Sequence, residues 1–169
     1  MTIAETLLPE FDQEMSSTRK MLECVPDEQF QWKPHEKSMT LGRIASHVAE
    51  MPSYGAATIN LASLEITPAH QPTNFATKDE LLAAFDKSVA ETRAAIAGAS
   101  DEQMMEIWSL IFGGRTAFSM PRVAVLRTMM MNHLIHHRGQ LSVYLRLLDV
   151  AIPGMYGPSA DQKAAVAQA

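Results

Sequence analysis

The sequence predicts an all-α fold, a four-helix bundle with a short irregular or hairpin excursion before the last long helix. Two observations support this prediction. Apolar residues recur at three- and four-residue spacing in four long segments, as they do on amphipathic helices, and no stretch has a convincing run of strands. Such helices bury their apolar stripes against one another, and facing helices can then build a metal site inside the bundle.

The first helix is expected to begin after Thr2 and to end before Pro26. Thr2 and Glu5 have the spacing of a capping box, in which each side chain accepts a hydrogen bond from the backbone amide of the other residue. Residues 26–39 contain prolines and isolated aromatics without a period, so we expect them to connect this helix to the next. The apolar stripe of the helix is Ile3, Leu7, Leu8, Phe11, Met15, Met21 and Leu22.

The second helix is expected to begin after Thr40, whose hydroxyl can cap it. Pro52 is expected to kink this helix, because proline lacks an amide donor and crowds the preceding turn. The helix can continue beyond the kink over residues 54–64. Residues 65–76 contain two prolines and are expected to form a loop.

The third helix is expected to begin at a Thr77 cap and to end at Gly98. Residues 108–120 contain Gly113 and Gly114 between apolar residues, which is compatible with a small hairpin or with an irregular excursion. The sequence leaves both alternatives open.

The fourth helix is expected to begin near Ser119 or Pro121 and to run to about Val150. The whole chain, residues 1–169, fits a single domain. Its alanine-rich end, from about residue 160 to 169, is expected to be a frayed tail. The fourth helix should direct inward Leu126, Met130, Leu134, Leu141, Tyr144, Leu145 and Leu148.

The composition excludes several classes of protein. The net charge is -5 and the Lys and Arg residues are scattered, whereas phosphate binding needs a clustered basic surface, so nucleic acid is not expected as a partner. No apolar run approaches the ~18 residues that would span a bilayer, and the N-terminus lacks the features of a signal peptide. The single cysteine, Cys24, cannot form an internal disulfide. We therefore expect a cytoplasmic protein with no membrane partner.

Three histidines are candidate metal ligands. His133 and His137 are four residues apart on the fourth helix, so they share a face and both imidazoles can reach one ion. His136 lies about 100° around the helix from His137 and is left out of the metal site. Because two ligands on one helix bind weakly, a third is needed, and His47 lies on an inward face of the second helix.

The expected site is one divalent ion bound by three imidazoles. Three nitrogen ligands leave at least one position open, which is typical of catalytic metal sites. Imidazole suits zinc, nickel, copper and iron, so the residues do not select the ion, and we expect zinc or nickel. The alternative is that the histidine pair binds no metal and hydrogen-bonds to carbonyls or carboxylates. His35 and His70 lie in expected loops and are assigned no role.

Tyr54, Tyr144 and Glu50 are further candidates for the pocket. Tyr54 is seven residues after His47 and Tyr144 is seven after His137, which is about two turns along the same helix face. Glu50 is the carboxylate nearest in sequence to a candidate metal ligand, His47. It can act as a catalytic base, hydrogen-bond to His47, or simply be a solvated surface side chain.

Neighbouring residues are assigned mainly packing roles. Met51 and Met129 each lie four residues from a candidate ligand and can form an apolar wall, although core filling is the commoner role of methionine. Arg138 either anchors a nearby carboxylate or binds a substrate, and packing is preferred for it and for Gln140. Gly139 suggests the close approach of another backbone.

Three segments carry a family resemblance: LGRIASHVAEMP, MPRVAVLR and NHLIHHRGQLSVYLRLLDVAIPGMYGPSAD. Together they closely resemble the DinB proteins of the wider DinB/YfiT-like superfamily, over nearly the whole chain. The resemblance implies a four-helix bundle, a homodimer and a metal triad at His47, His133 and His137, the same trio that the spacing selects. Small residues spread over the third helix offer a partial reason for a dimer, because they permit close helix approach.

The expected activity follows from the open metal position. Such a metal can activate water, polarise a carbonyl or bind a thiolate. The resemblance implies a thiol-dependent transferase or a hydrolase of a small-molecule substrate, with a low-molecular-weight thiol among the candidate partners. The alternative is a non-catalytic metal-binding protein that acts in a stress response or an interaction.

Overall fold

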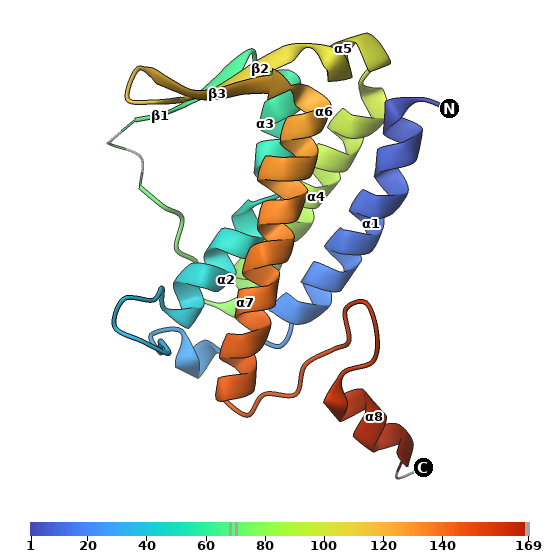
Figure 1. The fold of residues 1–169 in the computed structure, drawn as a ribbon. Helices are drawn as coiled ribbons and strands as arrows, with labels where there is room; N and C mark the ends of the chain where they lie inside the picture. The colour runs from blue at the N-terminus through green and yellow to red at the C-terminus, as the bar shows by residue number, and fades with distance from the viewer. Residues whose placement is uncertain (68, 70, 168–169) are drawn as a thin grey trace.

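The computed structural model describes residues 1–67, 69 and 71–167 of the chain (Figure 1). Most of these residues are helical, and a small three-stranded sheet lies at one end of the helices. The expected all-α class therefore needs one correction, the sheet. The helices are α1 (Ile3–Leu22), α2 (Leu41–Glu50), α3 (Ser53–Asn60), α4 (Lys78–Gly98), α5 (Asp101–Met105), α6 (Arg122–Val125), α7 (His133–Leu147) and α8 (Ala160–Ala167), with a 3-10 turn at Asp27–Gln29 and a π-helical segment at Leu126–Asn132; the strands are β1 (Ser63–Ile66), β2 (Ile107–Phe112) and β3 (Arg115–Pro121).

Threonine caps begin the long helices where the sequence predicts them. The Thr2 hydroxyl accepts a hydrogen bond from the Glu5 amide at 3.1 Å, and the Glu5 carboxylate accepts from the Thr2 amide at 2.7 Å. Helix α1 then ends before Pro26. Thr40 and Thr77 cap α2 and α4, each through an amide three residues further on.

The second expected helix is broken at Pro52 into α2 and α3, as the proline predicts. The Thr92 hydroxyl of α4 donates to the Pro52 carbonyl at 2.5 Å and accepts from the Ala56 amide at 3.0 Å. A fully buried side chain of α4 therefore binds two backbone groups in the first turn of α3, and the Pro52 carbonyl also accepts from the Gly55 amide at 2.9 Å. These contacts hold the start of α3, the helix that carries Tyr54, against α4.

The sheet has the order β1-β2-β3, with β1 parallel and β3 antiparallel to β2. Strands β2 and β3 confirm the hairpin alternative, and their turn places Gly113 and Gly114 at φ values of 52° and 77°, which glycine adopts without strain. Strand β1 lies where the sequence suggests the end of a helix and a loop, so that assignment is wrong. Ser63–Ile66 pairs with residues far along the chain, 109–112, and no local pattern indicates such a pairing.

The fourth expected helix begins at Arg122 and ends at Leu147, close to the expected bounds. It runs without a gap through α6, the π segment (Leu126–Asn132) and α7. The π segment buries Leu126 and the adjacent Met130 and Met131; the inward face expected from the sequence includes Leu126 and Met130 but not Met131. The return to α-helix comes at His133, the first candidate ligand of α7.

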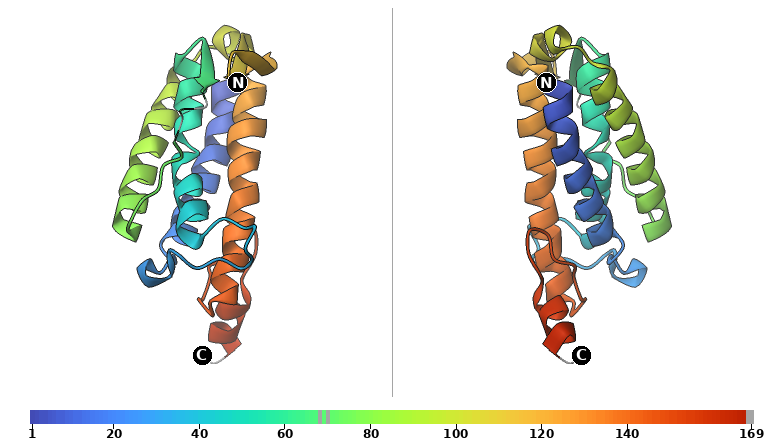
Figure 2. Two further views of the ribbon diagram at one scale, coloured as in Figure 1. Left: turned by 90° about the vertical axis from the view of Figure 1, so that its left-hand side faces the viewer. Right: turned by 90° about the vertical axis from the view of Figure 1, so that its right-hand side faces the viewer.

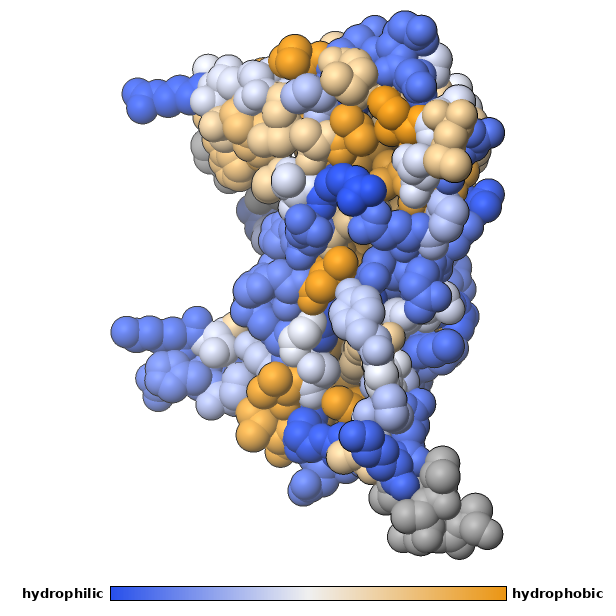
Figure 3. Space-filling model, turned by 45° about the vertical axis from the view of Figure 1, so that its right-hand side comes forward, coloured by the Kyte–Doolittle hydropathy of each residue, from blue (hydrophilic) through white to orange (hydrophobic). Residues whose placement is uncertain are grey.

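The helices pack side by side around one apolar core (Figure 2). Helix α4 contacts α1, α2 and α3, and α7 contacts α1 and α2. On the face drawn in Figure 3, hydrophobic residues gather at the end that carries α5 and the sheet, while the middle is mostly hydrophilic. Among the described residues, no helix is long and apolar enough to cross a membrane.

A buried ion pair joins α1 to α7. Arg138, which is 2% exposed, donates to the Glu14 carboxylate at 2.6 Å, and the Tyr156 hydroxyl donates to the same carboxylate at 3.0 Å. Further along the chain, Asp161 accepts a hydrogen bond from Arg146 at 2.5 Å. The segment expected to be a frayed tail is therefore helical as α8 over Ala160–Ala167 and is tied back to α7.

Candidate metal centre

Three imidazoles converge between α2 and α7. His47, His133 and His137 each offer one nitrogen, and these nitrogens lie within 4.8 Å of one another. The ring centroid of His137 is 4.7 Å from that of each of the other two, which are 5.3 Å apart. All three side chains are half-buried. The structure therefore brings together the three histidines that the sequence selects from two distant helices.

Glu50 orients the His47 ring. The Nδ1–H of His47 donates to the Glu50 carboxylate at 2.8 Å, and Arg43 donates to the same oxygen at 3.2 Å. Burial opposes ionisation of Glu50, but the hydrogen bonds from His47 and Arg43 and the charge of Arg43 lower its pKa below the usual value. An ionised carboxylate can only accept, so Nδ1 of His47 carries a hydrogen, and Nε2 is the ring nitrogen left to face an ion.

Gln140 orients the His137 ring in the same way. The Nδ1–H of His137 donates to the Gln140 side-chain oxygen at 2.7 Å, which leaves a lone pair on Nε2. That Nε2 lies 2.9 Å from the Nε2 of His133. Two ring nitrogens that face each other so closely must share either a hydrogen or a cation.

Burial keeps the two α7 imidazoles neutral. It lowers the pKa of His133, and the neighbouring His47 lowers it further. It lowers the pKa of His137 to about 4, against the opposing effect of the Gln140 hydrogen bond. Neutral imidazole is the form that binds metal, so both side chains are in the ligand state at neutral pH.

The donor set fits a divalent transition metal ion. Two of the three rings donate their Nδ1–H to an oxygen acceptor on their own helix, which is the usual arrangement around histidines that bind metal through Nε2. Imidazole nitrogen suits zinc, nickel, copper and iron more than magnesium or calcium, which prefer oxygen. Within the described part of the chain, these three residues form the one group of ligand side chains close enough to hold an ion.

The other histidines stand apart from this group. The ring of His136 lies 5.0 Å from that of His137, but its side chain is exposed and it does not join the cluster. His35 is exposed in a loop and accepts a hydrogen bond from the Lys37 amide. His70 lies outside the described residues. Leaving His35 and His136 out of the site is therefore consistent with their positions.

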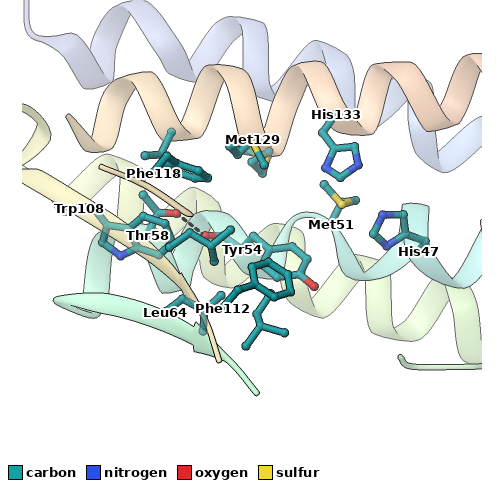
Figure 4. A pocket seen from close by; sticks show the side chains of 14 residues that line it. His47, Met51, Tyr54, Thr58, Leu64, Trp108, Phe112, Phe118, Met129 and His133 are labelled. Atoms are coloured by element: carbon teal, nitrogen blue, oxygen red, sulfur yellow. Dashed lines mark hydrogen bonds between the residues drawn. The ribbon is translucent and has the colours of Figure 1, made fainter. Parts of the chain in front are cut away.

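An apolar cavity of about 310 Å³ opens beside the histidines (Figure 4). His47 and His133 lie at one end of it, and Trp108, Phe118 and Leu64 lie toward the other. Helix α3, the π segment and the sheet form its walls. The lining residues are His47, Met51, Tyr54, Thr58, Leu64, Ile66, Trp108, Leu110, Phe112, Phe118, Val125, Met129, Met130 and His133.

The pocket candidates fall into two groups. Tyr54 lines the cavity, and so do Met51 and Met129, which form the apolar wall that their spacing allows. Burial, followed by the charge of Glu50, raises the pKa of the Tyr54 phenol, so it stays protonated. Tyr144 is not among the lining residues; its ring packs edge-to-face against Trp32 at 5.8 Å.

Three assignments on α7 can now be judged. Arg138 anchors the Glu14 carboxylate, one of the two roles open to it. The packing role of Gln140 is wrong, because its side chain holds a candidate ligand. The close backbone approach expected at Gly139 is also wrong, since a Cβ there would meet no atom within 4 Å.

The sheet side of the cavity was missed by the sequence reasoning. Trp108, Leu110 and Phe112 lie at every second position of β2 and all line the cavity. That alternation, if taken as a strand with one apolar face, could have indicated the wall. The alternation was obscured because Ile107 and Ile111 on the other face are apolar as well, which leaves Ser109 as the one polar residue of the strand.

The chain has clear relatives among known proteins. A model of the DinB family matches residues 1–168. The chain is also 28% identical over 162 residues to the uncharacterized protein YrdA of Bacillus subtilis strain 168, covering 92% of this chain and 89% of YrdA.

Solved structures share the fold. A DinB-like protein from Bacillus cereus ATCC 10987 is 25% identical, with a TM-score of 0.70 over 92% of this chain and 98% of that one. The DinB-like protein YjoA from Bacillus subtilis is 20% identical, with a TM-score of 0.66 over 89% and 96% of the two chains. The second likeness shows the fold alone.

Proposed function

Because the chain belongs to the DinB family, and because three imidazoles converge beside an apolar cavity, we propose that it binds one divalent metal ion through His47, His133 and His137. Zinc or nickel is the ion we expect, from the all-nitrogen donor set. Glu50 and Gln140 hold two of the ligand rings so that Nε2 faces the ion.

The proposal extends to catalysis by a metal-dependent enzyme, either a thiol-dependent transferase or a hydrolase of a small substrate. One observation supports it: the histidine cluster contributes two of its rings to the wall of a cavity, where a substrate can reach the open metal position. A structural zinc site usually closes its shell with four protein ligands and needs no cavity. When bound, the metal would supply a Lewis acid that activates water, a carbonyl or a thiol.

The residues around the ion would each have a defined task. His47 and His133 line one end of the cavity, and the side chains beside them in the lining are mostly apolar, which would strengthen electrostatic interactions near the ion. Tyr54, kept protonated by burial, can donate a hydrogen bond to a polar group of a ligand. We also propose that the protein acts in the cytoplasm as a homodimer, as the family resemblance implies.

A turnover screen tests the catalytic proposal. Metal-loaded wild type would be assayed with low-molecular-weight thiols plus electrophilic acceptors, and separately with simple esters and amides, alongside the His47→Ala, His133→Ala, His137→Ala triple variant. We expect one class to turn over with wild type and not with the triple variant. Equal rates for the two proteins, or no turnover by a fully loaded wild type, would instead favour a non-catalytic metal-binding protein with a stress-response or interaction role.

A further inference from the structure

We infer that the cavity takes a ligand with an uncharged, apolar body of about a dozen non-hydrogen atoms and one metal-coordinating donor at its end. This inference rests on the proposed metal site, and it names the class of molecule that the site would act on. Three features of the cavity carry it: its lining, its volume and the position of the histidines at one end.

The lining is apolar and carries no carboxylate, lysine or arginine. Besides the two histidines, its polar side chains are Tyr54, Thr58 and Trp108, and the Thr58 hydroxyl already donates to the Tyr54 carbonyl at 2.7 Å. A charged group placed among these side chains would lose its hydration without gaining a group of opposite charge; the donors within the lining are the neutral Tyr54 hydroxyl and the Trp108 Nε1–H, which has no hydrogen-bond partner among the described residues. The body of the ligand must therefore be uncharged, which excludes amino-acid-like groups from this part of the site. Sugar-like groups are excluded as well, because so few polar side chains would leave most of their hydroxyls without hydrogen-bond partners.

The volume sets the size of that body. A dry cavity of about 150 Å³ lined by aliphatic and aromatic side chains can hold benzene, so a cavity of twice that size accommodates about two rings or an equivalent branched chain. The cavity beside the histidines measures about 310 Å³. Its aromatic walls, which include Trp108, Phe112 and Phe118, favour an aromatic body through edge and offset contacts.

The position of the histidines sets the orientation of the ligand. His47 and His133 occupy one end of the cavity, and Trp108 and Leu64 lie toward the end next to the sheet (Figure 4). A ligand that fills the cavity lengthwise therefore presents one terminus to the metal ligands and packs its body against the sheet. A thiol, hydroxamate or carboxylate at that terminus has the chemistry to coordinate the ion.

Two positions of β2 offer a matched pair of variants. Leu110 lines the cavity, while its neighbour Ile111 does not, and both side chains are half-buried in the same strand. Leu110→Trp should fill part of the cavity. Ile111→Trp adds the same side chain on the other face of the strand and controls for its effect on the sheet.

Calorimetric titration of zinc-loaded protein, with no free zinc, would compare phenylbutanethiol, ethanethiol and butylbenzene. We expect phenylbutanethiol to bind at least about tenfold more tightly than ethanethiol, since it buries a ring and two more methylenes. Leu110→Trp should remove most of this difference and Ile111→Trp should preserve it. Butylbenzene should bind equally well with and without zinc, because it uses only the apolar part of the site.

The outcomes separate the two proposals. Equal affinities for the two thiols on zinc-loaded wild type, or a Leu110→Trp variant that binds phenylbutanethiol as wild type does, would overturn the inference about the cavity while leaving the metal site standing. A different result would contradict the metal site itself. In that result, the affinity for phenylbutanethiol equals that for butylbenzene, does not change when zinc is removed, and still falls in Leu110→Trp. The ligand would then need no coordinating end group.

Discussion

At the scale of single residues, Glu50 and Gln140 have the same relation to the histidines that they hold. Each lies three residues after its histidine on the same helix and accepts a hydrogen bond from Nδ1, at 2.8 Å and 2.7 Å. One turn of helix therefore supplies both a ligand and the acceptor that orients it. The rings are set before any metal arrives, because neither contact depends on the ion.

Removing either acceptor should weaken metal binding without changing the ligands. We predict that Glu50→Ala and Gln140→Ala each lower zinc affinity about 10- to 100-fold, because the freed ring can rotate and change its tautomer. Glu50→Gln should lose less, since its amide oxygen can still accept from His47. Competition with a chelator of known affinity measures the change. Glu36→Ala, which removes an exposed carboxylate, is the control, and unchanged affinity in both acceptor variants would contradict this role.

The buried His137 imidazole should make the metal-free protein sensitive to mild acid. Its folded pKa of about 4 lies below the usual 6.5, so the unfolded chain binds the proton first. The free energy of unfolding should therefore be constant above about pH 7 and fall as the pH drops from about 6.5 toward 4. Thermal melts across this range check the prediction.

Two variants identify the residue that causes this pH dependence. His137→Gln should flatten the decline, while His136→Gln, which changes an exposed ring next to it, should leave the decline unchanged. If wild type and His137→Gln lose stability in parallel as the pH falls, burial of His137 is not the cause.

At the scale of elements, two of the ion pairs that α1 makes with other helices differ in their burial. Glu14 is buried with Arg138 of α7, whereas Asp12 pairs with Arg93 of α4 at 2.8 Å where the side chains are about half exposed. Removing one partner of a buried pair leaves an uncompensated charge. A surface pair is screened by water and contributes little.

These two pairs give a prediction for unfolding. Glu14→Ala should lower the free energy of unfolding by about 3–5 kcal/mol, and Asp12→Ala by about 1 kcal/mol or less. Denaturant titration of the two variants against wild type measures both changes. Similar losses from Asp12→Ala and Glu14→Ala would show that the buried pair does not join α1 to α7 as described.

The predictability of each element depends on whether its signal is local. Threonine caps, the Pro52 break and the turn at Gly113 and Gly114 are encoded within a few residues, and the structure confirms all of them. Strand β1 is four residues long and pairs with a distant strand, so its sequence carries almost no signal. The π segment was missed because a wider turn uses the same residue types as an α-helix and leaves no signal in the composition.

The same reasoning explains what could be predicted of the site. His133 and His137 share a face by a four-residue spacing, and His47 lies on an apolar helix face, so simple periodicity selects the trio. The alternation in β2 could have indicated one wall of the cavity, but the part contributed by β1 could not be predicted, because β1 depends on pairing with distant residues. Gln140 was given a packing role because a polar side chain next to a ligand looks the same in sequence whether it faces the ligand or solvent.

At the scale of the whole molecule, we predict a homodimer in solution, as the family resemblance implies. Light scattering at micromolar concentration should report a mass near twice the 18.6 kDa of one chain. The triple histidine variant should remain dimeric if the interface is separate from the metal site. A monomer throughout that concentration range would refute the prediction.

The histidine cluster joins elements that are far apart in the chain, so occupancy by metal reports on the fold and the site together. His47 is held by α2 and the other two ligands by α7, and these helices pack against each other. A third ligand on a second helix turns a weak chelating pair into a site. Metal content therefore depends on all three positions and should not depend on the exposed His136.

Elemental analysis after gentle dialysis at neutral pH tests the central claim most directly. We predict one divalent ion per chain in wild type and in His136→Ala, a strongly reduced content in His47→Ala, and none in the His133→Ala, His137→Ala double variant. Metal content unchanged in that double variant, or equal losses from His136→Ala and His137→Ala, would contradict the assignment of His47, His133 and His137 as the metal ligands.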